Sequence, residues 1–184
     1  NEQPMPEFVI RPVTAENWAD FAALFEARGG PHYCWCTIYR FSSHHLMSSP
    51  EKMRAMHDLV ANDIPIGVLA YDKDVPAGWC SIAPRESYTS LNRSRKMPRV
   101  TPLDAATWTV LCFFVARLYR GKGLPATLLR SGVDYARAQG AQVIEAYPFD
   151  SVGNSSTHRG HSSVYESVGF RREGERWHLD IAEV

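Results

Sequence analysis

The spacing of hydrophobic residues changes several times along the chain, and each change indicates a strand or a helix. Short apolar runs bounded by glycine, proline or charged residues are typical of strands, whereas apolar residues three and four positions apart are typical of helices. The pattern predicts strands at 8–11, 107–116 and 141–149, hairpins at 66–84 and 170–181, and helices at 14–30, 49–63, from 123 onward and at 160–170. This mixed alternation indicates an α/β or α+β fold with a mixed central sheet.

Individual residues mark where the first helices begin and end. Thr14 and Ser49 are the expected N-caps, and the pair Gly29–Gly30 is expected to end the first helix. Residues 31–47 are rich in aromatic side chains without a clear period, so a short helix and an ordered loop both fit. Residues 85–106 are polar and basic, and a connection of this length is usually functional or mobile.

Composition narrows the class of protein. The 184 residues are 45% hydrophobic and suit one domain spanning 1–184 that folds without a disulfide or a metal. Twenty basic and twenty acidic residues give no overall field for nucleic acid or a membrane surface, so neither is an expected partner and any anion site must be local. No apolar run approaches the ~18 residues of a membrane span, and no signal-peptide pattern is present at the first residues. Four isolated cysteines fit a reducing compartment, and we therefore expect a cytoplasmic protein.

The strongest chemical signal lies in the stretch RLYRGKGLPA, residues 117–126. Here the chain leaves an apolar strand and enters a helix. Gly121 and Gly123 allow the backbone to approach a ligand closely, and the first helical turn offers N–H groups without partners. Arg120 and Lys122 add positive charge. Together these features predict a phosphate or pyrophosphate site, although the string alone also fits a glycine-eased turn with solvated basic residues.

Two familiar phosphate loops are excluded, because the chain has neither G-x-x-x-x-G-K-[ST] nor G-x-G-x-x-G followed by an acidic residue at the required distance. The string resembles instead the acetyl-CoA loop of the GNAT superfamily of N-acetyltransferases, whose motif runs Arg/Gln-x-x-Gly-x-Gly/Ala. Arg120 and Gly123 match this motif. Pro125 departs from its last position, and proline lacks the N–H that would reach a pyrophosphate there.

A second resemblance covers VYESVGF, residues 164–170. Tyr165 falls on the tyrosine that, in the superfamily, usually returns a proton to the leaving thiolate. The superfamily often has an asparagine seven residues earlier, where this chain has His158, with Asn154 nearby. The order of elements is similar to the GNAT layout along nearly the whole chain, which implies a mixed central sheet of about seven strands flanked by helices. The strings CWC, AGWCSIAPRESY, CFFV and VIEAYPFD also resemble a bacterial branch of the superfamily whose acceptors are largely unassigned.

The resemblance implies acetyl-CoA as co-substrate and no metal. In the superfamily the strand before the loop diverges from the next parallel strand, and the pantetheine arm fills the gap. By this resemblance Phe113, Phe114 and Val115 pair with pantetheine through their backbones, and the Val115 N–H faces the thioester carbonyl. The implied pyrophosphate contacts are Arg120, Gly121, Lys122, Gly123, Leu124, Pro125, Ala126 and Thr127. The remaining implied contacts are Asn154 and His158, and the implied general acid is Tyr165.

The general base is less defined. Glu145 stands in the middle of an apolar strand, and a buried carboxylate needs a partner or a purpose, so it is the first candidate. A salt bridge to an arginine in the core or at the sheet edge stays open beside that interpretation. Asp104 and Glu86, near the ends of the basic connection, are weaker candidates.

The cysteines give no metal signal. Cys34 and Cys36 are separated by one residue and no second pair matches them, so zinc is not expected and buried apolar thiols are the default interpretation. Cys112 lies near the end of the strand that the resemblance assigns to the cofactor, so a catalytic cysteine is possible. Alternation along the strand puts it on the same face as Phe114, which favours a packing role.

The sequence therefore predicts an enzyme that transfers an acetyl group from acetyl-CoA to an amine of a small molecule or protein, by direct attack in a ternary complex. A non-catalytic acyl-CoA-binding sensor or degenerate GNAT module is the alternative. An RNA-associated protein is a third interpretation, less favoured because a short basic run in a neutral chain is usually solvated. The sequence does not identify the acceptor, nor does it distinguish a monomer from a homodimer.

Overall fold

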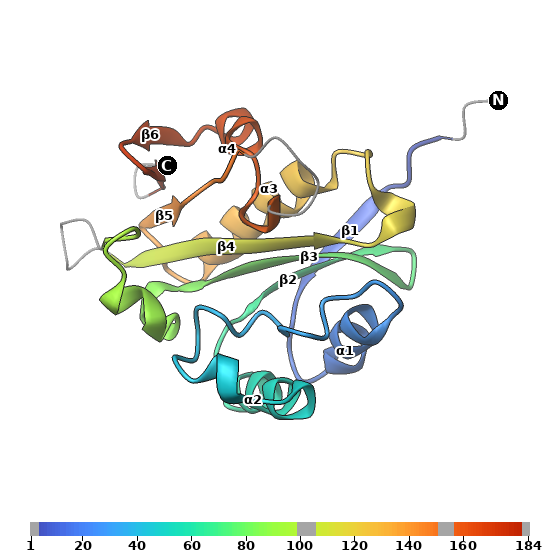
Figure 1. Cartoon of the computed structure of the whole chain (residues 1–184). Helices are drawn as coiled ribbons and strands as arrows, with labels where there is room; N and C mark the ends of the chain where they lie inside the picture. Colours follow the sequence, from blue (N-terminus) through green and yellow to red (C-terminus); the bar gives the residue numbers. More distant parts are fainter. Residues whose placement is uncertain (1–3, 99–105, 151–156, 182–184) are drawn as a thin grey trace.

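The protein is built around one mixed β-sheet, seen in a computed structural model that describes residues 4–98, 106–150 and 157–181 (Figure 1). The sheet has seven strands in the order β1-β2-β3-β4-β5-β7-β6. The strands are β1 (Phe8–Pro12), β2 (Gly67–Asp72), β3 (Val75–Pro84), β4 (Thr107–Val115), β5 (Val143–Ala146), β6 (Arg171–Glu173) and β7 (Arg176–Asp180). β4 and β5 are parallel, and the other neighbours are antiparallel. The predicted fold class is confirmed.

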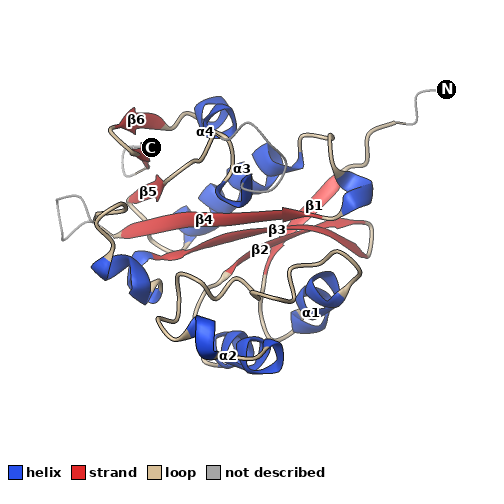
Figure 2. Cartoon of the chain, in the orientation of Figure 1, coloured by secondary structure: helices blue, strands red, loops and turns tan. Residues whose placement is uncertain are grey.

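Helices cover both faces of this sheet (Figures 1 and 2). One face carries α1 (Trp18–Glu26) and α2 (Ser49–Ala61), and the other carries α3 (Leu124–Ala138) and α4 (Ser162–Val168). Each face has its own buried apolar cluster, so the sheet lies between two cores. No helix in the described ranges is long and apolar enough to cross a membrane.

β4 runs between the two cores, which explains its almost unbroken apolar sequence. Side chains alternate across a strand. Phe113 accordingly packs with the α3 and α4 cluster, whereas Cys112 and Phe114 pack with the α1 and α2 cluster. The sequence-based placement of Cys112 and Phe114 on one face is therefore confirmed.

Two predicted helix starts are wrong by one turn or less. α2 is capped by Ser48 rather than Ser49, because Ser48 and Glu51 form a reciprocal capping box (2.6 and 3.3 Å). The Ser49 hydroxyl donates instead to the His32 carbonyl (2.6 Å). α1 begins at Trp18, since Asn17 rather than Thr14 is the residue before its first turn.

The two segments whose structure the sequence left open are ordered. Residues 31–47 form turns and a short 3-10 helix, His44–Leu46, packed over the sheet. The described part of the long connection, 85–98, contains the 3-10 helices η2 (Arg85–Ser87) and η3 (Thr89–Arg93). Its side chains Tyr88, Leu91 and Met97 are buried, so this part is packed.

Candidate active site

The parallel strands β4 and β5 separate before β4 ends. They pair from Thr107 with Val143 to Val110 with Ala146, where β5 stops, but β4 continues to Val115 beside β3. The Ala116 N–H donates to the Ala77 carbonyl (2.9 Å). Because backbone groups alternate in direction, those of Phe113 and Val115 point away from β3, toward the side where β5 has ended.

A glycine-containing turn connects the end of β4 to α3. After the 3-10 turn η4 (Arg117–Tyr119), Gly121 and Gly123 both adopt the left-handed conformation (φ +75° and +71°). A Cβ atom at either glycine would meet nothing within 4 Å, so the space in front of this backbone is open. Gly123 directly precedes α3, whose first N–H groups have no partner within the helix. The geometry fits an anion at a helix start.

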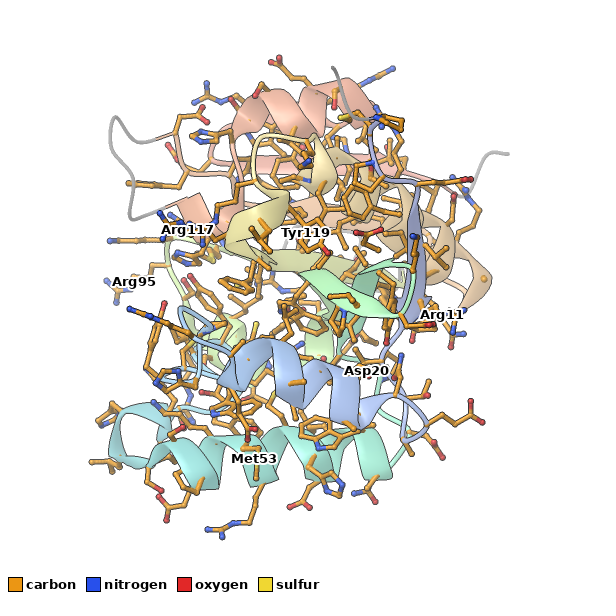
Figure 3. The ribbon with its side chains drawn as sticks, turned by 90° about the vertical axis from the view of Figure 1, so that its right-hand side faces the viewer. Arg11, Asp20, Met53, Arg95, Arg117 and Tyr119 are labelled. Atoms are coloured by element: carbon orange, nitrogen blue, oxygen red, sulfur yellow. The ribbon has the colours of Figure 1, made fainter. Side chains whose placement is uncertain are left out.

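Side chains around this turn fix it and make it positive. Arg120 is exposed, and its Nε donates to the Val115 carbonyl (3.0 Å), which holds the guanidinium beside the end of β4. Tyr119 is labelled in Figure 3. Its hydroxyl donates to Asp72 (3.1 Å), which ties the turn to the β2–β3 hairpin. Lys122 is half-buried, and Leu124 is fully buried against the sheet, so Leu124 can offer a ligand only its backbone.

Tyr165, the predicted acid, lies in α4 with its ring fully buried. It makes edge contacts with Phe113 of β4 and with Phe170 (centroids 6.2 and 5.2 Å). Its hydroxyl donates to the Arg159 carbonyl (2.7 Å). Burial raises the pKa of this phenol well above its usual value, so the hydroxyl stays protonated at neutral pH.

Two further candidate cofactor contacts precede α4. His158 belongs to a short 3-10 turn, Thr157–Arg159 (η5), and its pKa is lowered by partial burial and by the neighbouring Arg159. Asn154 and Asp104 lie outside the described residues. Gly160 follows in the left-handed conformation, and a Cβ there would come within 3.1 Å of the Phe113 and Tyr165 rings. Glycine is therefore required where this turn crosses β4.

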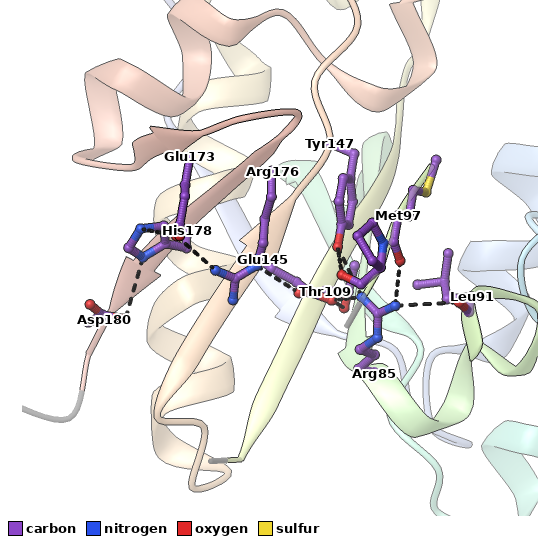
Figure 4. Close-up of polar contacts among 11 residues, drawn as sticks. Arg85, Leu91, Met97, Thr109, Glu145, Tyr147, Glu173, Arg176, His178 and Asp180 are labelled. Atoms are coloured by element: carbon purple, nitrogen blue, oxygen red, sulfur yellow. Dashed lines mark hydrogen bonds and ion pairs between the residues drawn. The ribbon is translucent and has the colours of Figure 1, made fainter. Parts of the chain in front are cut away.

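Glu145 does not have the surroundings of a general base, so this prediction is corrected. Its carboxylate is completely buried and is paired with two guanidinium groups, those of Arg85 and Arg176 (Figure 4). The Thr109 hydroxyl also donates to it (2.8 Å). Both carboxylate oxygens are engaged by these three partners, and the side chain is buried from solvent. The salt bridge that the sequence left open is the arrangement found.

The same ion-pair network holds the loop that follows β3. Arg85 donates to Glu145 and Tyr147, and its other terminal nitrogen reaches the Met97 carbonyl (2.6 Å). The Tyr147 hydroxyl donates to the Pro98 carbonyl (3.2 Å). Sequence reasoning missed Arg85 and Tyr147, although an arginine that directly ends an apolar strand is a signal that could have suggested the pairing.

A cavity of about 520 Å³ opens beside this network, at the end of β5. Its charged lining residues are Arg95, Lys96, Arg159, Glu173, Glu175 and Arg176. Arg159 links the cavity to Tyr165, because its carbonyl accepts the Tyr165 hydroxyl while its guanidinium lies over the Phe149 ring (5.1 Å). Arg159 therefore lies between the cavity and Tyr165, which does not itself line the cavity. The described ranges contain no group of three His, Cys, Asp or Glu side chains that could hold a metal.

Most of the chain matches the model of a known protein family. The model of the acetyltransferase (GNAT) family matches residues 21–170. The chain therefore belongs to the GNAT family of acetyltransferases. No curated protein matches it.

Solved structures of this family have the same fold. A ribosomal-protein-S5-alanine acetyltransferase from Vibrio fischeri is 16% identical, with a TM-score of 0.58 over 100% of this chain and 97% of its own. A GNAT family N-acetyltransferase from Escherichia coli in complex with CoA is 16% identical (TM-score 0.53; 98% and 84% covered). A GNAT family acetyltransferase from Brucella melitensis in complex with acetyl-CoA is 12% identical (TM-score 0.51; 95% and 88% covered). Identities this low establish the fold alone.

The structural role of Glu145 predicts a large loss of stability on its neutralisation. Glu145→Gln leaves the buried Arg85 guanidinium without a counter-charge and leaves Arg176 only its longer pair with Glu173 (3.8 Å), and we expect the free energy of unfolding to fall by about 3–5 kcal/mol in urea denaturation. Arg137→Gln is the control, because it breaks an exposed pair with Asp134 and should cost at most ~0.5 kcal/mol. Equal losses in the two variants would contradict the proposed role of Glu145.

Proposed function

We propose that this protein is an acetyl-CoA-dependent N-acetyltransferase that acetylates an amine of a small molecule or protein. The observation that carries the proposal is the separation of β4 from β5 directly before a glycine turn and a helix start. A gap between strands suits an extended amide-containing arm, and the helix start suits a diphosphate. The gap between the strands and the start of α3 meet at one junction, as required by a ligand whose extended arm is joined to a diphosphate.

The residues around the junction fit coenzyme A. Backbone groups of Phe113 and Val115 would pair with the pantetheine arm, with Phe114 between them and the Val115 N–H available to a thioester carbonyl. The backbone from Gly121 to Thr127 and the charges of Arg120 and Lys122 would hold the diphosphate, with Pro125 contributing no N–H. When bound, acetyl-CoA supplies an activated acyl group.

Tyr165 would supply the proton for the departing thiolate. It is protonated, buried, and in contact with Phe113 of the diverging strand. A positioned acid contributes a factor of about 10²–10⁴ to such a step. No base is assigned to Glu145, because its carboxylate is fully engaged. The amine nitrogen must lose its proton before it attacks, and water is a sufficient acceptor for that proton when the amine enters from solvent.

The cavity beside β5 would admit the acceptor. It reaches Arg159, whose carbonyl binds the Tyr165 hydroxyl, so an amine there would meet the thioester from the side of the acid. Glu173 and Glu175 on the β6–β7 turn give one wall of the cavity negative charge, which attracts an ammonium group before it loses its proton. Glu173 already pairs with Arg176 and His178, which leaves Glu175 as the better candidate for this contact.

The first test concerns the diphosphate site. Gly123→Ala should raise the Kd for CoA at least about 10-fold in calorimetry, since the new methyl group would project into the open space in front of the turn. Gly140→Ala is a matched control, because Gly140 also has positive φ and open surroundings but lies beyond the other end of α3. Both variants should lose similar stability, about 1–2 kcal/mol, and only Gly123→Ala should lose affinity. Equal CoA affinities would refute the site.

The second test concerns the acid. Tyr165→Phe should lower kcat by about 10²-fold with little change in the KM for acetyl-CoA, measured by release of free thiol with a panel of amines. Tyr135→Phe, a half-buried tyrosine of α3 that packs against Trp108, is the control and should keep full activity. A wild-type protein that binds CoA but consumes thioester with no amine would favour the non-catalytic acyl-CoA-binding module instead.

The third test concerns the acceptor cavity. Glu175→Gln should raise the KM for a cationic amine about 5-fold at low salt, which corresponds to roughly 1 kcal/mol, and leave CoA binding unchanged. The effect should shrink with added salt, because the glutamate is exposed. Glu26→Gln, beside a separate cavity near α2, should have no effect on this KM. An unchanged KM in Glu175→Gln would place the acceptor elsewhere.

A further inference from the structure

Arg40, in the loop between α1 and α2, is a buried cation with an unusual set of partners. It is only 2% exposed. Its terminal nitrogens donate to the carbonyls of Cys36 and Ile66 (both 2.8 Å) and to the hydroxyls of Ser81 and Tyr88 (3.1 and 3.3 Å). All four of these acceptors are uncharged. Among the described residues, no carboxylate forms an ion pair with Arg40, in contrast to Arg85 and Arg176.

An arginine keeps its charge in proteins, and an uncompensated buried charge is costly. One nearby atom can carry the missing negative charge. The Cys36 sulfur lies 3.5 Å from Nη1 of Arg40 and is buried. Cys36 and the preceding Trp35 are both left-handed (φ +59° and +48°), an arrangement that costs free energy in residues other than glycine. The chain accepts this strain where it turns Cys36 toward the guanidinium.

A second thiol, that of Cys112, lies in the same buried cluster as Cys36. Cys112 pairs with Ser81 across the β3–β4 ladder, and Arg40 binds the Ser81 hydroxyl, so Arg40 spans from Cys36 to the neighbour of Cys112. The hydrogen bond from Cys112, followed by Arg40 and Ser81, outweighs burial and lowers the pKa of Cys36 to about 5. The same hydrogen bond, together with burial, raises the pKa of Cys112 well above its usual value. These opposite shifts favour a thiolate on Cys36 and a thiol on Cys112.

The other two cysteines lack this environment. Burial raises the pKa of Cys34 to about 11, and burial also raises the pKa of Cys80, which faces the opposite core. The Trp79 indole N–H is buried and has no hydrogen-bond partner among the described residues. Its proximity helps to lower the pKa of Cys36. An anionic sulfur is a suitable acceptor for such a group.

We propose that Cys36 is a thiolate held by Arg40, and that Cys36 and Cys112 form a modification site at which a hydroperoxide joins the two sulfurs. In the first step the Cys36 thiolate attacks one oxygen of the peroxide and the O–O bond breaks. Cys36 becomes a sulfenic acid, and the other oxygen departs as hydroxide. In the second step the Cys112 sulfur attacks the oxidised Cys36 sulfur, the S–S bond forms, and the Cys112 proton leaves with the hydroxyl group as water. Each pair reduces one molecule of hydrogen peroxide.

This site is separate from acetyl transfer, but its position next to the end of β4 would let oxidation affect the strand that we assign to the cofactor. Cys112 directly precedes Phe113 on the diverging part of β4, while Cys36 belongs to the loop that covers this face of the sheet. Cys112 is half-buried as a residue, so the pair lies close to the surface, and the oxidant that fits the site is a small neutral one. A disulfide here would fix the covering loop to the strand that we assign to pantetheine.

How the charge of the Cys36 thiolate changes with pH depends on the titratable groups around it. Several charged and titratable groups surround Cys36. They are Arg40 and Cys34 of its own loop, Tyr39 beside them, Tyr88 of the following connection, Cys112 of β4, His158 of η5 and, on the opposite face of the sheet, Cys80 of β3. Of these, only His158 ordinarily titrates between pH 5 and 8, and its pKa is lowered. The thiolate should therefore persist across that range.

The experiment uses the full chain, treated with iodoacetamide and mapped by mass spectrometry. An ordinary thiol with a pKa near 8.5 reacts roughly 80-fold faster at pH 8 than at pH 6, whereas Cys36 should vary less than about 2-fold. Cys112→Ala removes the hydrogen-bonding thiol without supplying another donor and should restore part of the pH dependence. Arg40→Gln should restore more of it than Arg40→Lys, and Cys112→Ala decides the question if the Arg40 variants do not fold. An alkylation rate of Cys36 that follows the ordinary thiol profile overturns the proposal.

Hydrogen peroxide provides the second measurement. The wild type should form one internal disulfide between Cys36 and Cys112, and the matched controls Cys34→Ser and Cys80→Ser should form it equally. Cys112→Ser should stop at a sulfenic acid that dimedone traps on Cys36, and Cys36→Ser should resist oxidation. Oxidation that maps first to Cys34 or Cys80, or a Cys36→Ser variant as sensitive as the wild type, would also refute the proposal. Neither measurement involves acetyl-CoA, so the result is independent of the proposed enzyme activity.

Discussion

The buried carboxylate of Glu145 determines where the central sheet is held closed and where it can open. It lies opposite Thr109 in the β4–β5 register, one pair before that pairing ends, and it binds Arg85 from the end of β3 and Arg176 from β7. Three strands and the following loop are therefore fixed around a single anion, in a site without solvent. The strands separate one residue beyond it. A gap that begins at a rigid point keeps its shape, as the binding of a reactive thioester requires.

The protein compensates its buried arginines in two chemically different ways. Arg85 and Arg176 share a carboxylate, whereas Arg40 is surrounded by carbonyls, hydroxyls and one sulfur. Both arrangements attach a loop to the sheet, and the two loops are joined to one another, since the Ser90 N–H donates to the Tyr39 carbonyl (3.1 Å). The cover over this end of β4 is thus one connected layer. The cavity beside β5 borders this layer, and Cys36 lies within it, above Cys112 of β4.

Local sequence signals predicted the parts of the site that a few consecutive residues build. The glycine turn, the helix start after Gly123 and the apolar strand before it are all encoded within about fifteen residues, so their geometry follows from local conformational preference. Tyr165 was singled out by a local motif, and its burial next to Phe113 agrees with that choice, while its role stays a prediction. Helix caps were less well predicted, because Ser48 and Ser49 both suit a cap and only the contact with His32 separates their roles.

What the sequence determined by itself is the order of elements, the class of fold and the glycine turn before α3, because hydrophobic period and glycine conformation act over short distances. What only the tertiary structure decided is the chemistry of isolated polar residues. Glu145 meets Arg85 from sixty positions away, and Arg40 meets Ser81 from forty-one. A carboxylate in an apolar strand has the same sequence appearance whether it is a base or an ion-pair partner, and a cysteine has the same appearance whether it is a thiol or a thiolate. The charge that faces each of them comes from a distant segment, and folding alone brings it into contact.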